Sequence, residues 1–484
     1  MKYIKISIVI LLVSFISIFA YKLTTNNSSN KISLTKEQMK EMLSYTIDGN
    51  STSSMPTKGS GYKVKSITCK NGSILSWDND NWLLEVEKLE SEDLCNIDFT
   101  TGTGSYTVTA VPSIAGSLDS TSKTTTENGQ VTFYTKLVID SVSGCTNEIS
   151  DGKVIIKNVT SNTTCNINVS YMKLYDKLLA DNPTRPGART SFSSTLTSNN
   201  TKTLYTSTEN GTTVYYFAGN ATDNWVKLGG YYWRIIRTNA DRSVRLLYHG
   251  TSTDTTEAYI NSSTAFNSSH TDSMYVGYMY GTSGSLESNR ANTNNSTIKE
   301  VIDSWYASNM TSYAKYLSET AIYCSDREVG EGTYTATGLK FYYAPYTRID
   351  TNKAATYGCT ATEDKFTVDS AAGNGKLTYP IALMTVDELV FAGGAYRESA
   401  LTWYYYNSVK GSSTGKISWW LMSPYDWGAN SSVFRTYGSD SPGFLYARRV
   451  DDTLGVRPVI SIKGNNLWKS GDGTASSPYE IVTN

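Results

Sequence analysis

The chain has 484 residues, enough for roughly two to four domains, and its 43 basic and 44 acidic residues leave a formal net charge of −1. This balance argues against a nucleic-acid-binding protein, which would carry a basic stripe, so no nucleic acid is predicted as a partner. Charged residues make up only 18% of the chain, and its 36 Tyr and 36 Gly, with many Ser, Thr and Asn, favour strands joined by polar turns.

The N-terminal residues combine Lys2 and Lys5 with an apolar run from Ile6 to Ala20. A basic end followed by an apolar stretch is typical of a signal peptide. A helix over 6–21 would be about 24 Å long, a little short of the roughly 30 Å hydrocarbon core of a bilayer. A cleaved signal peptide and an uncleaved membrane anchor therefore both stay open. Either one predicts export, with the rest of the chain at the cell surface or secreted.

Polar residues dominate 22–54, which is predicted to be a stalk. Within it, Thr35 and Gln38 form a capping-box pair that predicts a short helix over 36–46.

Two segments then repeat one arrangement of cysteines and strands. In each, a strand ends near a first cysteine, an apolar strand follows, and the last strand starts with Cys-Asn-Ile. The matched positions predict the disulfides Cys69–Cys95 and Cys145–Cys165, each contributing about 3 kcal/mol by constraining the unfolded chain. The alternating residues 105–111 predict a further strand. Both segments look like the small β-sandwich repeats found as spacers on Gram-positive surface proteins.

A short linking helix is predicted at 171–181, and Pro183, Pro186 and Gly187 then break the chain. The predicted parts are a signal peptide or anchor (1–21), a stalk (22–54), a first β repeat (55–100), a second β repeat (101–170), a helical linker (171–187) and a C-terminal domain (188–484).

The C-terminal part mixes strands and helices. Strands are predicted at 214–217, 226–238, 244–248, 419–424, 433–436, 443–447 and 455–462. Helices are predicted at 297–307, which has an amphipathic face, and at 385–392, which starts with the capping box Thr385 and Glu388. This pattern indicates an α+β domain. Cys324 and Cys359 are expected to form a third structural disulfide, because no pair of cysteines has the C-x-x-C spacing of a metal or redox site.

Three motifs of this part carry a resemblance: Tyr-Tyr-Trp-Arg-Ile-Ile at 231–236, Trp-Leu-Met-Ser-Pro at 420–424 and Gly-Val-Arg-Pro at 455–458. They resemble a family of gut Firmicutes surface proteins that looks like a branch of the C-type-lectin-like superfamily. The formylglycine-generating-enzyme-like fold and the variable proteins of diversity-generating retroelements are its neighbours. The resemblance implies a C-type-lectin-like domain in which the segment between Pro424 and Gly455 is an exposed, ligand-facing surface.

That segment is rich in the residue types that dominate binding hot spots and antibody-like surfaces. The candidate ligand-binding residues are Tyr425, Asp426, Trp427, Asn430, Arg435, Tyr437, Asp440, Tyr446, Arg448, Arg449 and Asp451, with Asp452 beside them. Alternation along 433–437 means that about half of its residues point inward. Arg457, next to Pro458, is expected to be structural and to bond backbone carbonyls.

Catalytic chemistry finds little support in the sequence. The only histidines are His249 and His270, and no cysteine follows Cys359, whereas the formylglycine-generating branch uses an active-site cysteine pair. The loop and strand motifs of calcium-dependent lectins are also missing from the C-terminal half. No catalytic residue, cofactor or metal is therefore predicted. The favoured function is non-catalytic binding of a glycan, a peptide, or a host or bacterial protein. A secreted enzyme and a passive envelope or assembly component are the alternatives.

Overall fold

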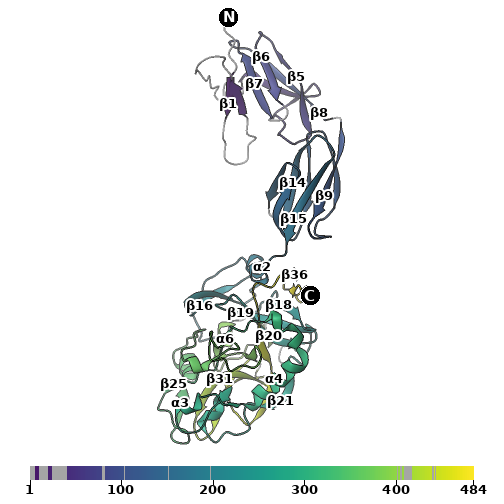
Figure 1. The fold of residues 1–484 in the computed structure, drawn as a ribbon. Coiled ribbons are helices and arrows are strands. Elements are labelled where there is room, and N and C mark those ends of the chain that lie inside the picture. The colour runs from purple at the N-terminus through teal and green to yellow at the C-terminus, as the bar shows by residue number, and fades with distance from the viewer. Residues whose placement is uncertain are drawn as a thin grey trace. The chain divides into compact units, whose positions relative to one another are not determined.

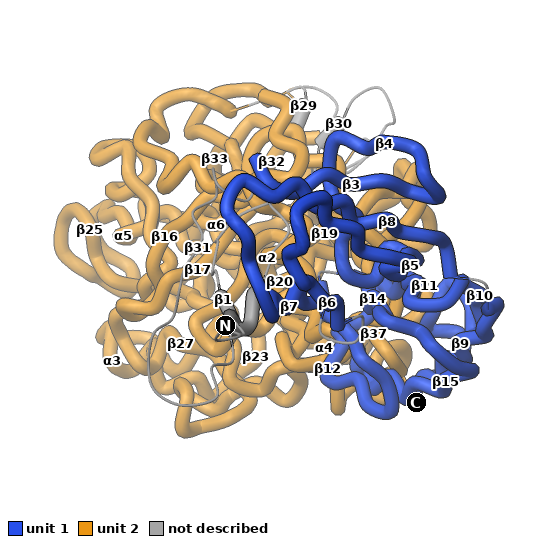
Figure 2. The backbone as a smooth tube through the Cα atoms, turned by 90° about the horizontal axis from the view of Figure 1, so that it is seen from above, with its two compact units in different colours: residues 1–171 blue, residues 172–484 orange. Residues whose placement is uncertain are grey.

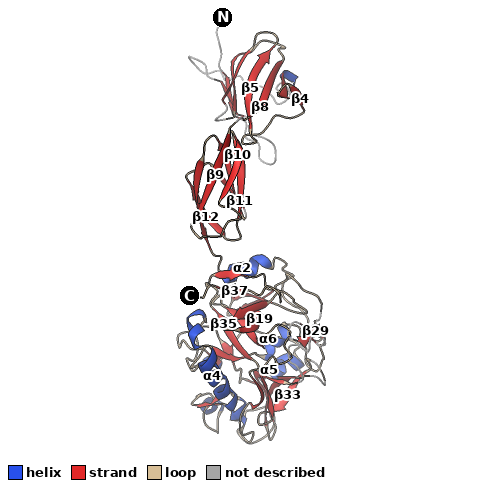
Figure 3. Ribbon diagram, turned by 90° about the vertical axis from the view of Figure 1, so that its right-hand side faces the viewer, coloured by secondary structure: helices blue, strands red, loops and turns tan. Residues whose placement is uncertain are grey.

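The computed structural model describes residues 6–9, 20–23, 41–78, 82–102, 104–150, 152–196, 198–400, 402–403, 406–407, 417–438, 441 and 443–483. It divides into two compact units, residues 1–171 and 172–484 (Figure 2). Most elements of both units are strands (Figure 3). Unit 1 holds two small disulfide-bonded β modules, and unit 2 is a larger β region with a few short helices.

The first β module consists of two four-stranded sheets (Figure 1). One has the order β1 (Ile6–Val9), β2 (Ala20–Leu23), β7 (Leu83–Lys88) and β6 (Ile74–Asp78); the other has the order β4 (Asn50–Thr52), β3 (Leu43–Ile47), β8 (Cys95–Thr101) and β5 (Tyr62–Cys69). Leu84 and Val86 of β7 pack with Ile97 and Phe99 of β8, because alternate residues of each strand face the shared core.

The predicted stalk helix over 36–46 is wrong over residues 43–46, which belong to β3. Leu43, Tyr45 and Ile47 alternate along β3 and pair in parallel with β8. This period of two fits a strand, and tertiary pairing with β8 overrides the capping-box signal. The first module therefore includes β3 and β4, which lie before the predicted boundary at residue 55.

The predicted N-terminal helix over 6–21 also differs from the structure where residues are described. Residues 6–9 and 20–23 are strands β1 and β2, which pair with each other and with β7. The β-branched residues Ile6, Ile8 and Val9 favour a strand. Residues 10–19, and the stalk residues 24–40, lie outside the described residues. No helix among the residues described is long and apolar enough to cross a bilayer.

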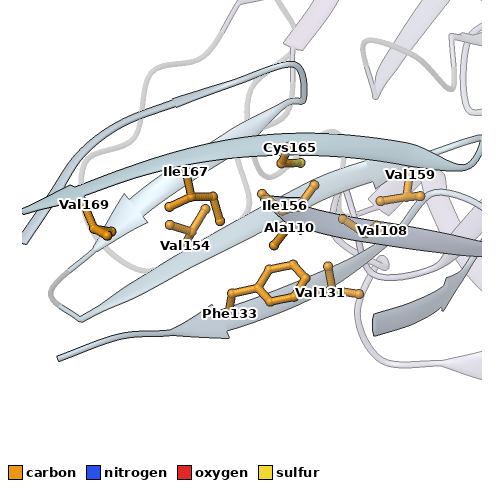
Figure 4. Close-up of a cluster of buried hydrophobic side chains, with 10 residues drawn as sticks. All are labelled: Val108, Ala110, Val131, Phe133, Val154, Ile156, Val159, Cys165, Ile167 and Val169. Atoms are coloured by element: carbon orange, nitrogen blue, oxygen red, sulfur yellow. The ribbon is translucent and has the colours of Figure 1, made fainter. Parts of the chain in front are cut away.

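The second β module also has two sheets. One has the order β10 (Ser122–Thr126), β9 (Ser105–Pro112), β15 (Thr163–Ser170) and β12 (Val138–Ser143); the other has the order β11 (Gly129–Tyr134), β14 (Lys153–Val159) and β13 (Asn147–Ser150). Figure 4 shows the apolar side chains of both sheets, among them Phe133, Ile156 and Ile167, turned into one core. The predicted strand over 105–111 is confirmed as β9.

The two modules share one topology, which confirms the internal repeat. In each, a hairpin strand (β3 or β9) pairs in parallel with the strand that carries Cys-Asn-Ile (β8 or β15). That strand pairs on its other side with the strand before the first cysteine (β5 or β12). The predicted disulfides Cys69–Cys95 and Cys145–Cys165 are both formed, as is Cys324–Cys359 in unit 2.

Unit 2 is built on two seven-stranded sheets. Sheet A has the order β16 (Tyr205–Glu209), β17 (Thr212–Tyr216), β19 (Tyr231–Thr238), β20 (Val244–Gly250), β35 (Pro458–Ile462) and β28 (Ile381–Leu383), with β18 (Trp225–Leu228) paired to β19. Sheet B has the order β21 (Asn261–Ala265), β34 (Thr453–Val456), β31 (Trp419–Trp427), β26 (Phe341–Tyr343) and β25 (Val329–Glu331), with β32 (Ser431–Thr436) on β31 and β33 (Leu445–Arg449) on β32.

Short strand pairs and helices complete unit 2. The pairs are β22 (Met279–Tyr280) with β23 (Asn294–Asn295), β24 (Tyr323–Cys324) with β27 (Lys365–Phe366), β29 (Thr402–Trp403) with β30 (Tyr406–Asn407), and β36 (Trp468–Ser470) with β37 (Glu480–Ile481). The helices are α2 (Leu174–Asp181), α3 (Leu286–Asn289), α4 (Thr297–Asn309), α5 (Ala344–Tyr346) and α6 (Val386–Phe391), with the short turns η1 (Ser273–Val276), η2 (Thr311–Tyr316), η3 (Thr347–Thr351) and η4 (Thr362–Asp364).

Both helices predicted for the C-terminal part are confirmed. Helix α4 buries Ile298 and Ile302, and α6 starts with the reciprocal capping box of Thr385 and Glu388. The single strand predicted over 226–238 is wrong, because Gly229 and Gly230 both have positive φ angles and turn the chain between β18 and β19. Paired glycines are typical of such a tight hairpin.

The first and last elements of unit 2 are hydrogen-bonded to each other. The amide of Leu174 donates to the carbonyl of Asn466 at 2.8 Å, and the amide of Trp468 donates to the carbonyl of Met172 at 2.7 Å. Leu174 and Leu178 of α2 are fully buried. Helix α2, predicted as a linker, thus packs as part of unit 2.

Candidate ligand-binding surface

Strand β31 carries three of the predicted binding residues, and all three are buried. Tyr425 is 6% exposed, Asp426 9% and Trp427 2%. The expected exposure is not found because β31 is a central strand of sheet B and every one of its residues is buried. A strand that is covered on both faces cannot present its side chains to a ligand.

Arg435 of β32 is also buried, at 8% exposure. Its guanidinium lies 3.5 Å from the ring centroid of Tyr437, and Nη1 donates to Ser418 Oγ at 3.2 Å. Burial therefore lowers the pKa of Arg435 below its usual value. This arginine supports the half-buried Tyr437 rather than reaching solvent.

The remaining candidates lie at the surface. Arg448 and Arg449 are exposed, while Asn430, Tyr446 and Asp451 are half-buried; Asp440 lies outside the described residues. Arg448 pairs with Asp452 at 2.6 Å and Arg449 with Asp451 at 2.5 Å, and Asp451 also contacts His270 Nδ1 at 2.8 Å. These charges therefore largely neutralise one another. Arg457 is fully buried and bonds the carbonyl of Tyr248, as expected of a structural arginine.

Among the described residues, five tyrosines, here called the tyrosine cluster, gather at one place on unit 2: Tyr342, Tyr346, Tyr396, Tyr425 and Tyr446. The rings of Tyr342 and Tyr346 stack with centroids 4.1 Å apart, and Tyr346 lies 4.9 Å from Tyr425. Tyr396 stacks on Tyr446 at 5.9 Å. Tyr396 and Tyr425 are buried at the base, and the other three rings are half-exposed.

Local structure explains how separate segments bring these rings together. Tyr342 pairs with Asp426 across β26 and β31, and Pro345 near the start of α5 turns the chain so that Tyr346 stacks on Tyr342. After α6, Gly393 has a φ of +124°, which suits glycine, and Tyr396 then bridges to Leu445 of β33.

The base of the cluster is joined by a hydrogen bond between the hydroxyls of Tyr396 and Tyr425, which are 2.7 Å apart. Burial raises the pKa of Tyr396 to about 12. Burial also raises the pKa of Tyr425, and the hydrogen bond with Tyr396 adds to that shift. Both phenols are therefore neutral at physiological pH and serve as fixed hydrogen-bonding groups beneath the exposed rings.

Three cations of the described part of the chain lie beside rings of the cluster. Lys340 Nζ lies 4.5 Å from the Tyr342 ring and 3.3 Å from Asp426. Lys353 Nζ lies 5.9 Å from the Tyr396 ring and 3.3 Å from Asp350. The guanidinium of Arg397 lies 5.3 Å from the Tyr396 ring and 4.9 Å from the Tyr446 ring.

Two of the five tyrosines, Tyr425 and Tyr446, were among the candidates predicted from the sequence, whereas Tyr342, Tyr346 and Tyr396, together with Arg397, were not. The run Phe-Tyr-Tyr-Ala-Pro-Tyr at 341–346 was a usable signal, because three tyrosines so close in sequence stand out even in this Tyr-rich chain. The Gly-Gly-Ala-Tyr-Arg run at 393–397 was a second one, since it predicts a turn followed by an aromatic residue and a cation.

A separate group of charges lies inside unit 2. Glu388 binds Arg237 at 3.0 Å and also Arg245; Arg237 in turn binds Glu209 at 2.8 Å. Burial would raise the pKa of Glu388, but Arg245 and Arg237 hold it below its usual value. The adjoining cavity is only about 20 Å³, room for about one water molecule. The charges of this buried network pair with each other, so we assign the network a role in stabilising unit 2.

One group among the described residues has the spacing of metal ligands: Cys69, Asp93 and Cys95. Both cysteines are consumed by their disulfide, which removes the thiolates that a metal would need. Asp93 instead accepts hydrogen bonds from the amides of Asn71 (2.6 Å) and Ser73 (2.8 Å). These residues therefore serve the fold of the first module.

No protein-family model matches the chain, and neither a curated protein nor a solved structure shows a significant match to it.

Proposed function

We propose that the chain is an exported recognition protein that binds its ligand non-covalently through the tyrosine cluster of unit 2. The observation that carries this proposal is the cluster itself: three half-exposed rings held by two buried, hydrogen-bonded ones. Tyrosine offers a large, rigid contact area with a polar end, which is why it is frequent in binding hot spots. The glycan, peptide or protein expected from the sequence would bind here rather than along β31.

Export is supported by the three disulfides. Disulfides persist in oxidising compartments and are rare where thiols are kept reduced. The basic and apolar N-terminal sequence points the same way. In this proposal the two β modules are spacers of the kind found on Gram-positive surface proteins, and the N-terminal segment is a signal peptide or anchor.

A C-type-lectin-like fold for unit 2 is part of the proposal. Its three resemblance motifs lie in β19, β31 and the β34–β35 region, which are central strands of the two sheets. Trp233, Trp420 and Arg457, one from each motif, are fully buried. Buried residues of this kind stabilise a fold and do not contact a ligand. The motifs therefore carry information about the fold and none about the ligand.

Array binding tests the proposal. The full chain is screened against glycan and protein arrays, and each ligand found is measured again with Tyr346→Ala and Tyr446→Ala. Removing a ring that contacts the ligand costs about 2 kcal/mol, or roughly a thirtyfold rise in Kd.

Tyr232→Ala is the matched control, because Tyr232 is half-buried beneath a cation, Lys227, outside the cluster. It should leave binding unchanged. If a ligand binds Tyr346→Ala and Tyr446→Ala as tightly as the unchanged protein, the protein binds that ligand elsewhere. If no ligand is found on the arrays, the proposed recognition function is wrong.

A further inference from the structure

We infer that Arg397 is the specificity-determining residue of the tyrosine cluster and that it anchors the acid group of an acidic glycan, a sugar chain carrying carboxylate or sulfate. This inference rests on the proposed function, since it names the ligand class of that same surface. It assigns the cluster two tasks: the rings hold the sugar, and the guanidinium selects its charge.

The side chain of Arg397 is exposed and is already held in place beside the tyrosine cluster. Its Nη2 donates to the hydroxyl of Tyr446 at 3.2 Å, and its guanidinium lies beside the rings of both Tyr396 and Tyr446. Its backbone amide donates to the carbonyl of Leu445 at 3.1 Å, which fixes this turn against β33. Contact with two rings limits the freedom of the side chain, so little entropy is lost when a ligand binds.

Arg397 differs from the two lysines beside the cluster in its charge partner. Lys340 and Lys353 each pair with an aspartate at 3.3 Å, whereas Arg397 has no carboxylate partner among the residues that the structure describes. An arginine has five N–H donors, and only one of them donates to Tyr446. The others can donate to the oxygens of an acid group from outside the protein.

The guanidinium of Arg397 matches the chemistry of an acid group. The planar fork of a guanidinium binds carboxylate and sulfate oxygens in pairs, and such charge-assisted hydrogen bonds are the strong ones. The hydroxyl groups of the half-exposed Tyr342, Tyr346 and Tyr446 can exchange hydrogen bonds with the hydroxyl groups of a sugar. Acidic peptides are instead typically bound by clusters of arginines, or along a strand edge, whereas Arg397 is the one arginine that contacts these rings among the described residues. The compact set of rings therefore favours an acidic glycan.

The test compares acidic and neutral polymers of the same sugar. The full chain is measured against polygalacturonate and its methyl ester, and against dextran sulfate and dextran. Arg397→Gln should weaken binding to an acidic polymer by on the order of tenfold or more, leave the weaker binding to its neutral counterpart unchanged, and keep the thermal unfolding of unit 2. Arg397→Lys should retain part of the preference.

Arg242→Gln is the matched control, because Arg242 is also exposed, also has a positive φ, and also lies beside a tyrosine ring, that of Tyr175 at 5.9 Å. An equal loss in both variants would reveal unspecific attraction to polyanions and overturn the inference. Equal affinity for acidic and neutral polymers, with loss in Tyr346→Ala, would overturn it while the proposed function stands. Competition by poly-glutamate as strong as by polygalacturonate would assign the site to acidic peptides. If none of these polymers binds, the inference falls, and protein ligands on the array then decide the proposed function.

Discussion

The β modules of unit 1 and the sheets of unit 2 are stabilised in different ways. Each module combines a small apolar core with one disulfide between its strands. Unit 2 is larger and places paired charges in its interior, with Glu388 between Arg237 and Arg245. Small modules bury too little apolar surface to dispense with a covalent link. Unit 2 also has a disulfide, Cys324–Cys359, but its larger interior can in addition accommodate charges that specify one arrangement.

Breaking the buried charge network should give the largest effect. Glu388→Gln leaves Arg245 without its carboxylate in a fully buried position, and unpairing a buried charge costs about 3–5 kcal/mol. Calorimetry of the full chain should show the unfolding transition of unit 2 at lower temperature, with that of unit 1 unchanged. Glu398→Gln, at an exposed site beside the tyrosine cluster, is the control and should change stability by about 0.5 kcal/mol at most. A harmless Glu388→Gln would mean that the network does not hold unit 2 together.

Removing the disulfide of a β module should have the next largest effect, and this effect should fall on unit 1 instead of unit 2. Cys145→Ala with Cys165→Ala opens a link across 20 residues, and the model of chain entropy gives a loss of about 3 kcal/mol. The transition of unit 1 should fall while that of unit 2 stays. If this pair of substitutions instead lowers the unit 2 transition, the contrast between the units is wrong.

Acid should weaken unit 2 in a smaller and graded way through His249. Burial, with Arg457 and Arg234 nearby, holds the pKa of this histidine well below 6.5, so the folded protein keeps it neutral. The unfolded chain takes up the proton below about pH 6.5, so stability falls as pH drops, by up to about 1.4 kcal/mol per pH unit. Denaturant titrations at pH 7.5, 6.5 and 5.5 measure this slope. In His249→Phe, which keeps an aromatic ring against Trp225, the slope in that window should be shallower; an unchanged slope would assign the acid sensitivity to other groups.

The features that were predicted correctly, such as the two module disulfides, have sequence patterns that lie close together in the chain. The paired Cys-Asn-Ile motifs recur at matched positions, so the disulfides Cys69–Cys95 and Cys145–Cys165 could be read without knowing the fold. The same holds for α4 and α6, whose periodicity and caps lie within the helix itself. Strand β3 was missed because its partner, β8, lies about 50 residues further along the chain, and that pairing leaves only a short alternating pattern in the sequence.

The candidate site shows the same limit more sharply. The segment from Trp419 to Trp427 is readable as a strand, but whether a strand lies at an edge or in the centre of a sheet depends on partners elsewhere, here β26, β32 and β34. The tyrosine cluster combines residues from positions 342 to 446. The runs at 341–346 and 393–397 mark candidate residues, but no spacing rule within one segment can predict that these residues meet.

The hydrogen bonds that join the two ends of unit 2 have a mechanical consequence. If a bound ligand is held while the preceding modules are pulled, tension enters unit 2 at Met172 and first meets its backbone bond to Trp468 and the bond between Leu174 and Asn466. Behind them, Leu174 and Leu178 must leave the interior before α2 can peel away. Under such a load, these bonds and the burial of α2 would have to give way before the tension distorted the tyrosine cluster.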